Sequence, residues 1–331
     1  MTPFSLVDAR SAAEAVALLE AHGAGAQIIA VGGDLLGLLK DGVEGPTLQR
    51  PHLLINLATA HDLAEIRVGP QELRLGAMAT LADLAGHRDL PSIISEATRS
   101  IASPQLRART TLGGNLLQRP RCWYFRHPDI DCFKKGGTDC PATGGPAEAY
   151  PGALMPGRCR AGHPSDLAPV LIALAAEAEL LGSGGTRRLP LAALYDGAEA
   201  NPTHEALLGA TEILTALVIP RADRLQAFEK VAPRPANEFA WASAALTVCL
   251  TQDHVAEARL ALGGIAPAPV LAPEAARLMT GRALRDMDPD AIAAAALPGS
   301  ALTDGHRARA AACRAAVRRA VARIVDGKPA A

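Results

Sequence analysis

The first sixty residues alternate between apolar periods typical of a helix and short apolar runs typical of a strand. The helical pattern begins after Ser11, which can act as an N-cap, and stops at Gly23. Residues 27–31 form a short, mostly apolar run, so we expect a buried strand that leads directly into Gly32-Gly33. The pattern predicts helices over 11–22 and 35–40 and strands over 27–31 and 52–56, a strand–glycine turn–helix–strand unit.

Similar patterns continue to residue 118 and resume after residue 165. The glycines of residues 182–185 lie between two strand-like runs with no helix after them, so we interpret them as a hairpin turn, not a phosphate-binding loop. Residues 110–118 contain a glycine pair and are expected to form a loop with strand edges. The other predicted elements are strands over 73–76, 177–181 and 186–190 and helices over 80–87 and 93–100.

The C-terminal third has its own series of apolar patterns, which indicates a separate α+β domain. The predicted strands cover 241–250 and 255–265, and the predicted helices cover 273–279, 289–296 and 303–324.

Residues 120–162 differ from the rest because they show no helical or strand period. A segment of this length without secondary structure is usually either functional or disordered. It holds four of the six cysteines and several of the chain's few aromatic residues, among them Trp123, Tyr124, Phe125 and Phe133. This concentration of scarce side chains favours a functional insert.

Length, composition and charge narrow the function classes. The chain has 331 residues, of which 49% are hydrophobic, enough for two or three domains with buried cores. Its 33 Lys and Arg balance 34 Asp and Glu, which argues against nucleic-acid or anionic-membrane binding as the main function. We expect no signal peptide and no membrane span. By its own sequence the chain is predicted to be cytoplasmic, where clustered cysteines bind metals more often than they form disulfides.

Two glycine pairs could form anion-binding turns. Gly32-Gly33 follows a predicted strand, and Gly113-Gly114 lies about eighty residues further on, between Thr111 and Asn115. Glycine lets backbone N–H groups approach a phosphate without interference from a Cβ atom. Either pair alone is more often a plain turn. The chain has neither a Gly-x-Gly-x-x-Gly dinucleotide motif nor a Walker loop.

Four cysteines in the insert are candidate metal ligands. They are Cys122, Cys132, Cys140 and Cys159, separated by nine, seven and eighteen residues. No Cys-x-x-Cys pair is present, which weakens a zinc ribbon, whereas long loops can wrap an iron–sulfur cubane from several sides. The spacing leaves a cluster, a zinc site and unligated or disulfide-bonded cysteines open. Cys249 and Cys313 are predicted to be packing residues.

Several motifs occur in the order found in one flavoprotein family. Residues 30–36 read Ala-Val-Gly-Gly-Asp-Leu-Leu and residues 109–115 read Arg-Thr-Thr-Leu-Gly-Gly-Asn, followed by motifs at 163–168, 228–230 and 262–267. The series resembles the FAD-binding subunit of molybdenum hydroxylases, the xanthine dehydrogenase family, over nearly the whole chain. Two positions depart from the family's pattern. Val31 replaces a glycine, and Gly33 replaces a threonine whose hydroxyl contact to phosphate would be lost.

The resemblance implies an α+β fold in two domains. Residues 1–222 would form a two-part FAD-binding domain of the vanillyl-alcohol-oxidase/PCMH type, with subdomains at 1–57 and 58–222. Residues 223–331 would form a C-terminal α+β domain of the CO dehydrogenase flavoprotein type.

The resemblance also implies the residues that hold FAD. The backbone of the first glycine turn and the second glycine loop would cradle the diphosphate. Asp166 would bind the adenosine ribose, Lys230 would lie near the isoalloxazine, and Leu208 would contact the flavin edge. The implied cofactor-binding residues are Val31, Gly32, Gly33, Asp34, Leu35, Leu36, Thr111, Gly113, Gly114, Asn115, Asp166, Leu208 and Lys230.

The cysteine segment resembles the flavin subunit of periplasmic aldehyde oxidoreductases, from Gly113 to Arg126 and again before Asp166. This resemblance implies that the insert at 119–162 binds a [4Fe–4S] cluster. The implied ligands are Cys122, Cys132, Cys140 and Cys159.

The resemblance further implies the partners and the reaction. No catalytic residue is expected in this chain, because a molybdopterin-binding large subunit would oxidise the substrate, an aldehyde. A [2Fe–2S] small subunit would pass electrons to FAD, which would pass them to an external acceptor. Co-export with a signal-bearing partner would place the complex in the periplasm.

Other functions remain compatible with the motifs. The chain could be the flavin subunit of a purine hydroxylase or of an acyl-CoA reductase. In a different class, it could be a zinc-stabilised binding module without a redox role. A stand-alone NAD-linked reductase is disfavoured by the missing dinucleotide motif.

Overall fold

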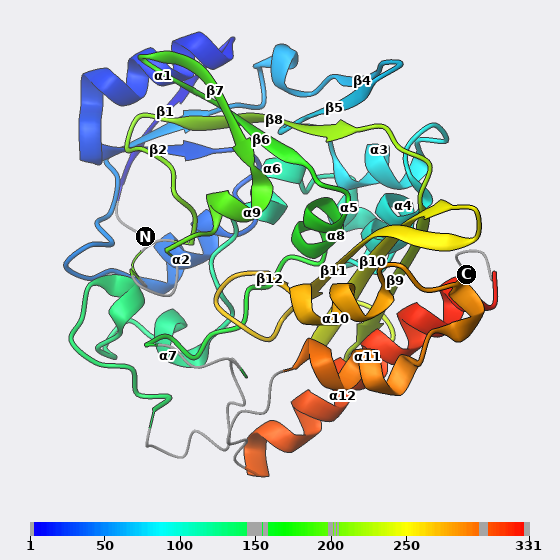
Figure 1. Ribbon diagram of the computed structural model, residues 1–331. Helices are drawn as coiled ribbons and strands as arrows, with labels where there is room; N and C mark the ends of the chain where they lie inside the picture. Colours follow the sequence, from blue (N-terminus) through cyan, green and yellow to red (C-terminus); the bar gives the residue numbers. More distant parts are fainter. Residues whose placement is uncertain are drawn as a thin grey trace.

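The computed structural model describes residues 3–143, 154, 158–197, 201, 203, 205–297 and 304–327, the last segment with side chains from residue 306 onward. Three β-sheets and the helices packed around them make up this part of the chain (Figure 1). The predicted α+β class is confirmed.

The N-terminal sheet is parallel and leads into the first glycine pair. It contains β1 (Ser5–Asp8), β2 (Ala26–Ile29) and β3 (Leu53–Asn56) in the spatial order β1-β3-β2. Helix α1 (Ala12–His22) begins after Ser11, whose hydroxyl accepts a hydrogen bond from the Glu14 N–H, and it packs on the sheet through buried alanine, valine and leucine side chains. Helix α2 (Leu35–Asp41) follows the glycine turn. The predicted strand–turn–helix–strand unit is confirmed.

The second sheet is antiparallel and five-stranded. It contains β4 (Ile66–Val68), β5 (Glu72–Gly76), β6 (Glu177–Gly182), β7 (Gly185–Pro190) and β8 (Ile213–Pro220) in the order β4-β5-β8-β6-β7. Strands β6 and β7 form the predicted hairpin, with Gly182 opposite Gly185. The helices of this region are α3 (Leu81–Gly86), α4 (Ser92–Arg99), α5 (Pro104–Arg107), α6 (Leu112–Leu116), α8 (Leu167–Ala173) and α9 (Leu191–Leu194).

The prediction for residues 110–118 is wrong, because they form helix α6 and not a loop with strand edges. The Thr111 hydroxyl caps the helix by accepting a hydrogen bond from the Gly114 N–H. Leu112 and Leu116 lie one helical turn apart and are both fully buried. Their burial outweighs the low helix propensity of the two glycines. A strand-like pairing remains only as an isolated bridge between Thr80 and Thr111 among the residues described for this segment.

The insert is largely irregular where the structure describes it. It contains the single-turn helix α7 (Trp123–Arg126) and a 3-10 turn at Phe133–Lys135. Residues 144–153 and 155–157 of the insert lie outside the described residues, as does residue 303 of the last predicted helix.

The third sheet is covered on both faces by helices. It contains β9 (Leu225–Val231), β10 (Ala242–Thr251), β11 (His254–Gly263) and β12 (Val270–Leu271) in the order β12-β11-β10-β9. Helices α10 (Pro273–Met279) and α12 (Asp304–Val325) pack on one face, with α11 (Pro289–Ala296) against both of them, and α8 packs on the other face. Along β10, Ala245 therefore joins one core and Leu246 the other. The predicted strands and helices of this region are confirmed.

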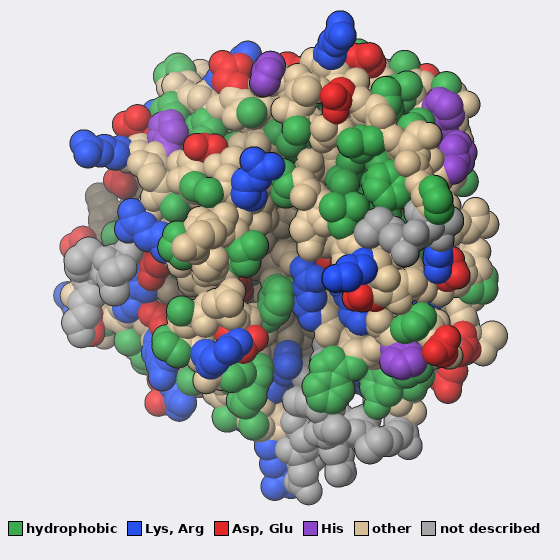
Figure 2. Space-filling view, turned by 180° about the vertical axis from the view of Figure 1, so that it is seen from behind, with side chains coloured by type: hydrophobic (Ala, Val, Ile, Leu, Met, Phe, Trp, Pro, Cys, Tyr) green, Lys and Arg blue, Asp and Glu red, His purple; other side chains and the backbone are tan. Residues whose placement is uncertain are grey.

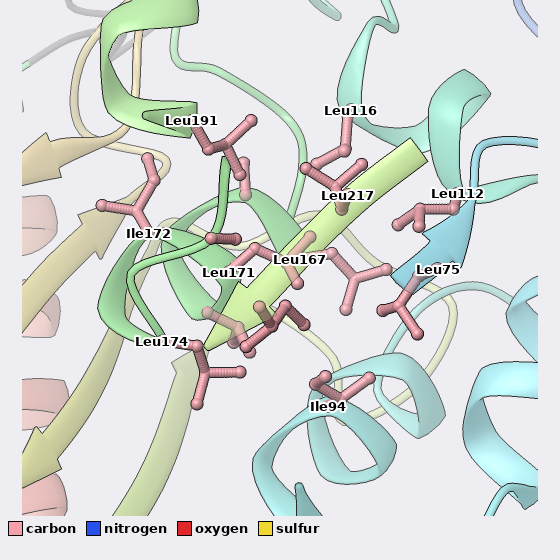
Figure 3. Packing of buried hydrophobic residues seen from close by; sticks show 14 of the residues in the cluster. Leu75, Ile94, Leu112, Leu116, Leu167, Leu171, Ile172, Leu174, Leu191 and Leu217 are labelled. Atoms are coloured by element: carbon pink, nitrogen blue, oxygen red, sulfur yellow. The ribbon is translucent and has the colours of Figure 1, made fainter. Parts of the chain in front are cut away.

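Helix α8 lies in the core between the second and third sheets (Figure 3). Its Leu167 and Leu171 are fully buried and share this core with Leu75 of β5 and Leu217 of β8. Since α8 begins directly after Asp166, its packing fixes the position of that residue, which lines the same cavity as the first glycine turn.

Candidate cofactor sites

A cavity of about 610 Å³ lies where the three parts of the fold meet. Its walls come from the first glycine turn, from helix α6, from the start of α8 and from the loop around Phe239. The molecule seen from behind is hollowed near its middle (Figure 2). Among the predicted cofactor-binding residues, the cavity is lined by Val31, Gly32, Gly33, Asp34, Leu35, Thr111, Gly113, Gly114, Asn115, Asp166 and Leu208. Leu36 and Lys230 lie behind this lining.

The first glycine turn is shaped to receive an anion. Gly32 has φ +74°, a left-handed conformation that favours glycine, and a Cβ there would collide with the Leu36 side chain. A Cβ on Gly33 would meet no protein atom within 4 Å. Among the hydrogen bonds of the described residues, none uses the backbone N–H groups of residues 31–35 as donors. Free N–H groups in front of an open cavity fit a phosphate or diphosphate.

The second glycine pair is built differently. The N–H of Gly113 donates to the Ala77 carbonyl oxygen at 2.7 Å, and that of Gly114 donates to the Thr111 hydroxyl at 3.2 Å. The Asn115 carbonyl oxygen of the side chain accepts from the Ser165 hydroxyl at 2.7 Å. These backbone donors are therefore already used inside the protein. A ligand can still approach the backbone of this helix closely, and the Thr111 hydroxyl can donate a hydrogen bond to it.

Asp166 and Lys230 form a buried ion pair at the cavity wall. The Lys230 ammonium donates to an Asp166 carboxylate oxygen at 2.7 Å and to the backbone carbonyl oxygens of Ser100 and Glu238. Burial raises the pKa of Asp166 above its usual range, and the Lys230 charge partly offsets this rise. The ion pair thus fixes the Asp166 carboxylate, which lines the cavity, from behind.

Asp34 joins the glycine turn to the cysteine insert. Its carboxylate accepts hydrogen bonds from the backbone N–H of Arg119 at 2.7 Å, from Arg121 at 2.7 Å and from Arg126 at 2.6 Å. Sequence reasoning included Asp34 only as part of the backbone cradle and gave the three arginines no role. The sequence does show three arginines between residues 119 and 126, on either side of the first cysteine. It could not show that they share a partner, because Asp34 lies more than eighty residues earlier in the chain.

The four insert cysteines are buried and influence one another. Burial, with a smaller effect of the Cys132 and Cys159 charges, raises the pKa of the Cys122 thiol to about 11. Burial also raises the pKa of Cys132 and of Cys159, and Cys140 adds to both effects. Cys122, Cys132 and Cys159 belong to one buried cluster, together with Phe125 and Ala161.

The chemistry of the four thiols fits an iron–sulfur cluster. A cubane binds each of four cysteines through a different iron atom and needs no nitrogen or oxygen ligand. A structural zinc ion can also use four cysteines, all about 2.3 Å from the ion. In the described ranges, no three His, Cys, Asp or Glu side chains are grouped so that one metal ion could be held.

Two family models match the chain along most of its length. The model described as the FAD binding domain in molybdopterin dehydrogenase matches residues 2–222. The model described as the CO dehydrogenase flavoprotein C-terminal domain matches residues 227–325.

No helix of the described residues is long and apolar enough to cross a bilayer.

Known relatives agree with these matches. The aldehyde oxidoreductase FAD-binding subunit PaoB of Escherichia coli K12 is 34% identical over 252 residues, which is 74% of this chain and 76% of the relative. The carbon monoxide dehydrogenase medium chain of Afipia carboxidovorans is 29% identical over 280 residues, 83% of this chain and 79% of the relative. A chain in the structure of reconstituted CO dehydrogenase from Oligotropha carboxidovorans superposes with a TM-score of 0.75 at 26% identity, covering 98% of this chain and 99% of that one.

Proposed function

The chain belongs to the FAD-binding subunits of the molybdenum hydroxylase family, and on this premise we propose that it is the electron-transfer subunit of an aldehyde oxidoreductase. It would bind FAD and one [4Fe–4S] cluster, and its catalytic partner would carry molybdopterin. The observation that carries the proposal is the single network in which Asp34 connects the cavity's glycine turn to the cysteine insert. The division at residue 222 would separate the FAD-binding domain from the C-terminal domain.

The FAD diphosphate would bind at the first glycine turn. Residues 31–35 line this end of the cavity, the described hydrogen bonds do not use their N–H groups, and a Cβ on Gly33 would meet no protein atom. The Thr111 hydroxyl and the Asn115 side chain line the same cavity from helix α6. Val31, Gly32, Gly33, Asp34, Leu35 and Leu36 of the first segment and Thr111, Gly113, Gly114 and Asn115 of the second would all contact the cofactor.

Asp166 and Lys230 would act together at one part of the bound cofactor. The carboxylate lines the cavity and can accept from ribose hydroxyls, while Lys230 holds it in place and keeps its charge compensated. The backbone and side chain of Leu208 close another part of the wall. FAD supplies a centre that takes up electrons singly or in pairs and passes them on, so these residues need only bind, orient and shield it.

The [4Fe–4S] cluster would be held by Cys122, Cys132, Cys140 and Cys159. Their thiols are buried among apolar side chains, with the fully buried Phe125 and Ala161 close by, so water would be excluded. The raised pKa values of Cys122, Cys132 and Cys159 mean that these three thiols keep their protons until a metal replaces them.

The proposed assembly is a heterotrimer. A molybdopterin-binding large subunit would oxidise an aldehyde to a carboxylic acid, and a [2Fe–2S] small subunit would carry the electrons to this chain. An external acceptor would take them from the flavin, and export with a signal-bearing partner would place the complex in the periplasm. The relative that supports the aldehyde as substrate is the Escherichia coli flavin subunit.

An anaerobic reduction of the assembled complex tests this function. An aromatic aldehyde should bleach the flavin absorbance in the complex, and it should leave the flavin of the isolated subunit oxidised. Hypoxanthine and carbon monoxide serve as the matched substrates of the related enzyme classes. Bleaching by either of these without bleaching by the aldehyde would contradict the proposed reaction, and bleaching of the isolated subunit would contradict the proposed division of labour.

A further inference from the structure

Two adjacent lysines of the insert are buried almost completely. Lys134 is 2% exposed and Lys135 is 3% exposed, and both belong to the 3-10 turn that directly follows Cys132. Lysine is among the residues least often buried, because a charge loses its hydration unless other groups compensate it. A buried pair in an irregular segment therefore calls for an anionic partner.

Two carboxylates next to the insert are each shared between cations. The Lys134 ammonium lies 2.9 Å from one Glu205 carboxylate oxygen, and the Arg119 guanidinium lies 2.8 Å from the other. Glu205 is itself only 7% exposed, so one buried carboxylate serves two cations. Asp34 likewise serves both Arg121 and Arg126.

Lys135 has a different environment. Its ammonium donates to the backbone carbonyl oxygens of His127 at 2.8 Å and Pro128 at 3.2 Å. Within the described ranges no carboxylate pairs with it. Carbonyl oxygens satisfy its N–H groups but do not neutralise its charge.

We infer that Lys134 and Lys135 are the counter-charges of the [4Fe–4S] cluster and favour its reduction. The inference rests on the proposed function, because it takes the four cysteines as the cluster ligands. Four thiolates outweigh the positive charge of an oxidised cubane core, so the bound group is an anion. When one electron enters it, no bond forms or breaks and the group gains one negative charge, which nearby fixed cations stabilise.

Both lysines lie next to a proposed ligand. The 3-10 turn that holds them begins directly after Cys132, and the backbone N–H of Lys134 donates to the Cys132 thiol. The backbone agrees with this placement, since the Lys135 N–H donates to the Cys132 carbonyl oxygen at 2.9 Å. A purely structural role for Lys135, joining residues 127–128 to the turn, predicts an effect on stability but none on the cluster's reduction potential.

A redox titration of the anaerobically purified full-length chain, followed by low-temperature EPR, distinguishes the two roles. The variant Lys135→Met removes one buried charge and should shift the oxidised-to-reduced ratio at a given potential about tenfold toward the oxidised form, about 59 mV for a one-electron couple. Glu205→Gln removes the negative charge that compensates Lys134 and Arg119, so it should shift the ratio toward the reduced form and raise the reduction potential. Lys135→Arg keeps the charge, and Lys40→Met removes an equal charge from an exposed position of α2, so both should titrate like the wild type.

The outcomes separate this inference from the proposed function. Opposite shifts in Lys135→Met and Glu205→Gln support the counter-charge role, because loss of a structural contact cannot move the potential in both directions. A full cluster with the same potential in both variants overturns the inference and leaves the proposed function standing. A wild-type chain that binds no iron after reconstitution refutes the proposed cluster, and the charge role falls with it. If Lys135→Met takes up no iron, the Glu205→Gln variant decides: a raised reduction potential supports the inference, and an unchanged or lowered potential overturns it.

Discussion

The Asp34 carboxylate accepts a hydrogen bond from the Arg126 guanidinium at 2.6 Å, and this contact ties the loop after β2 to the helix that follows Cys122. Arg121 shares the same carboxylate oxygen. A residue next to the cavity's glycine turn therefore also positions the first cysteine of the insert. The two candidate cofactor sites are mechanically connected through one side chain.

We expect Asp34→Asn to weaken both sites at once. Loss of the negative charge leaves two partly buried arginines uncompensated and should lower the free energy of unfolding by about 2 kcal/mol. Urea unfolding measures that change, and flavin fluorescence and iron content measure the losses at the two sites. Asp41→Asn changes the same group at the exposed end of α2 and is the control. A variant that loses FAD affinity with its iron content intact would show that the two sites are independent.

Gly33→Asp should impair FAD binding without impairing folding. A Cβ at this position meets no protein atom, and Gly33 lines the cavity at the proposed diphosphate site, where a carboxylate would repel the phosphates. We expect the FAD dissociation constant to rise at least about tenfold, equivalent to about 1.4 kcal/mol, with little change in the urea midpoint. Gly37→Asp adds the same carboxylate on α2, at a position whose Cβ meets no atom within 4 Å and which does not line the cavity. Equal FAD affinities in the two variants would exclude the turn as the phosphate site.

Cys122→Ser should abolish the cluster, and Cys249→Ser should not. Cys122 is buried in one cluster with Cys132 and Cys159, whereas Cys249 lies near the C-terminal end of β10 in the third sheet. Iron analysis after anaerobic reconstitution should fall from about four atoms per chain toward zero in the first variant only. Full iron binding by Cys122→Ser would remove this residue from the proposed ligand set.

His163 should make the protein less stable in mild acid. Burial, with a smaller effect of the Lys134 charge, lowers the pKa of His163 to about 3, and its Nδ1 accepts a hydrogen bond from the Ser165 N–H. Below pH 6.5 the unfolded chain takes up a proton that the folded chain excludes. The free energy of unfolding therefore falls as the pH drops from 6.5 toward 3, by at most about 1.4 kcal/mol per pH unit from this group.

Urea unfolding at several pH values between 7 and 5 measures this contribution. His163→Phe keeps a ring against Tyr195 and should flatten the slope, while the exposed His61→Gln should leave it unchanged. Equal slopes in the wild type and in His163→Phe would contradict the assignment.

The sequence predicted elements whose formation depends on local pattern. The unit from α1 to β3 and the strands and helices after residue 241 were predicted to within a few residues, because periodicity and capping act over a single turn or strand. Helix α6 was missed because its stability comes from burial of Leu112 and Leu116 against distant parts of the chain. The low helix propensity of Gly113-Gly114 instead favours a turn.

The hydrogen bonds and ion pairs that join the site residues could not be predicted from local sequence patterns. The Asp34 carboxylate pairs with arginines that lie up to 92 residues away in the sequence, and Lys230 pairs with Asp166 across 64 residues. Family motifs indicated that these residues belong to the site, but not that two of them form one ion pair. That the second glycine pair uses its own N–H donors internally also depends on its packing against Ala77.

Flavin and metal content of the anaerobically purified full-length chain, measured together on one sample, test the central claim most directly. The account predicts about one FAD and about four iron atoms per chain, with sulfide in equal number to the iron and no stoichiometric zinc. One zinc per chain without flavin after full loading with FAD would contradict it and would favour a zinc-stabilised binding module instead.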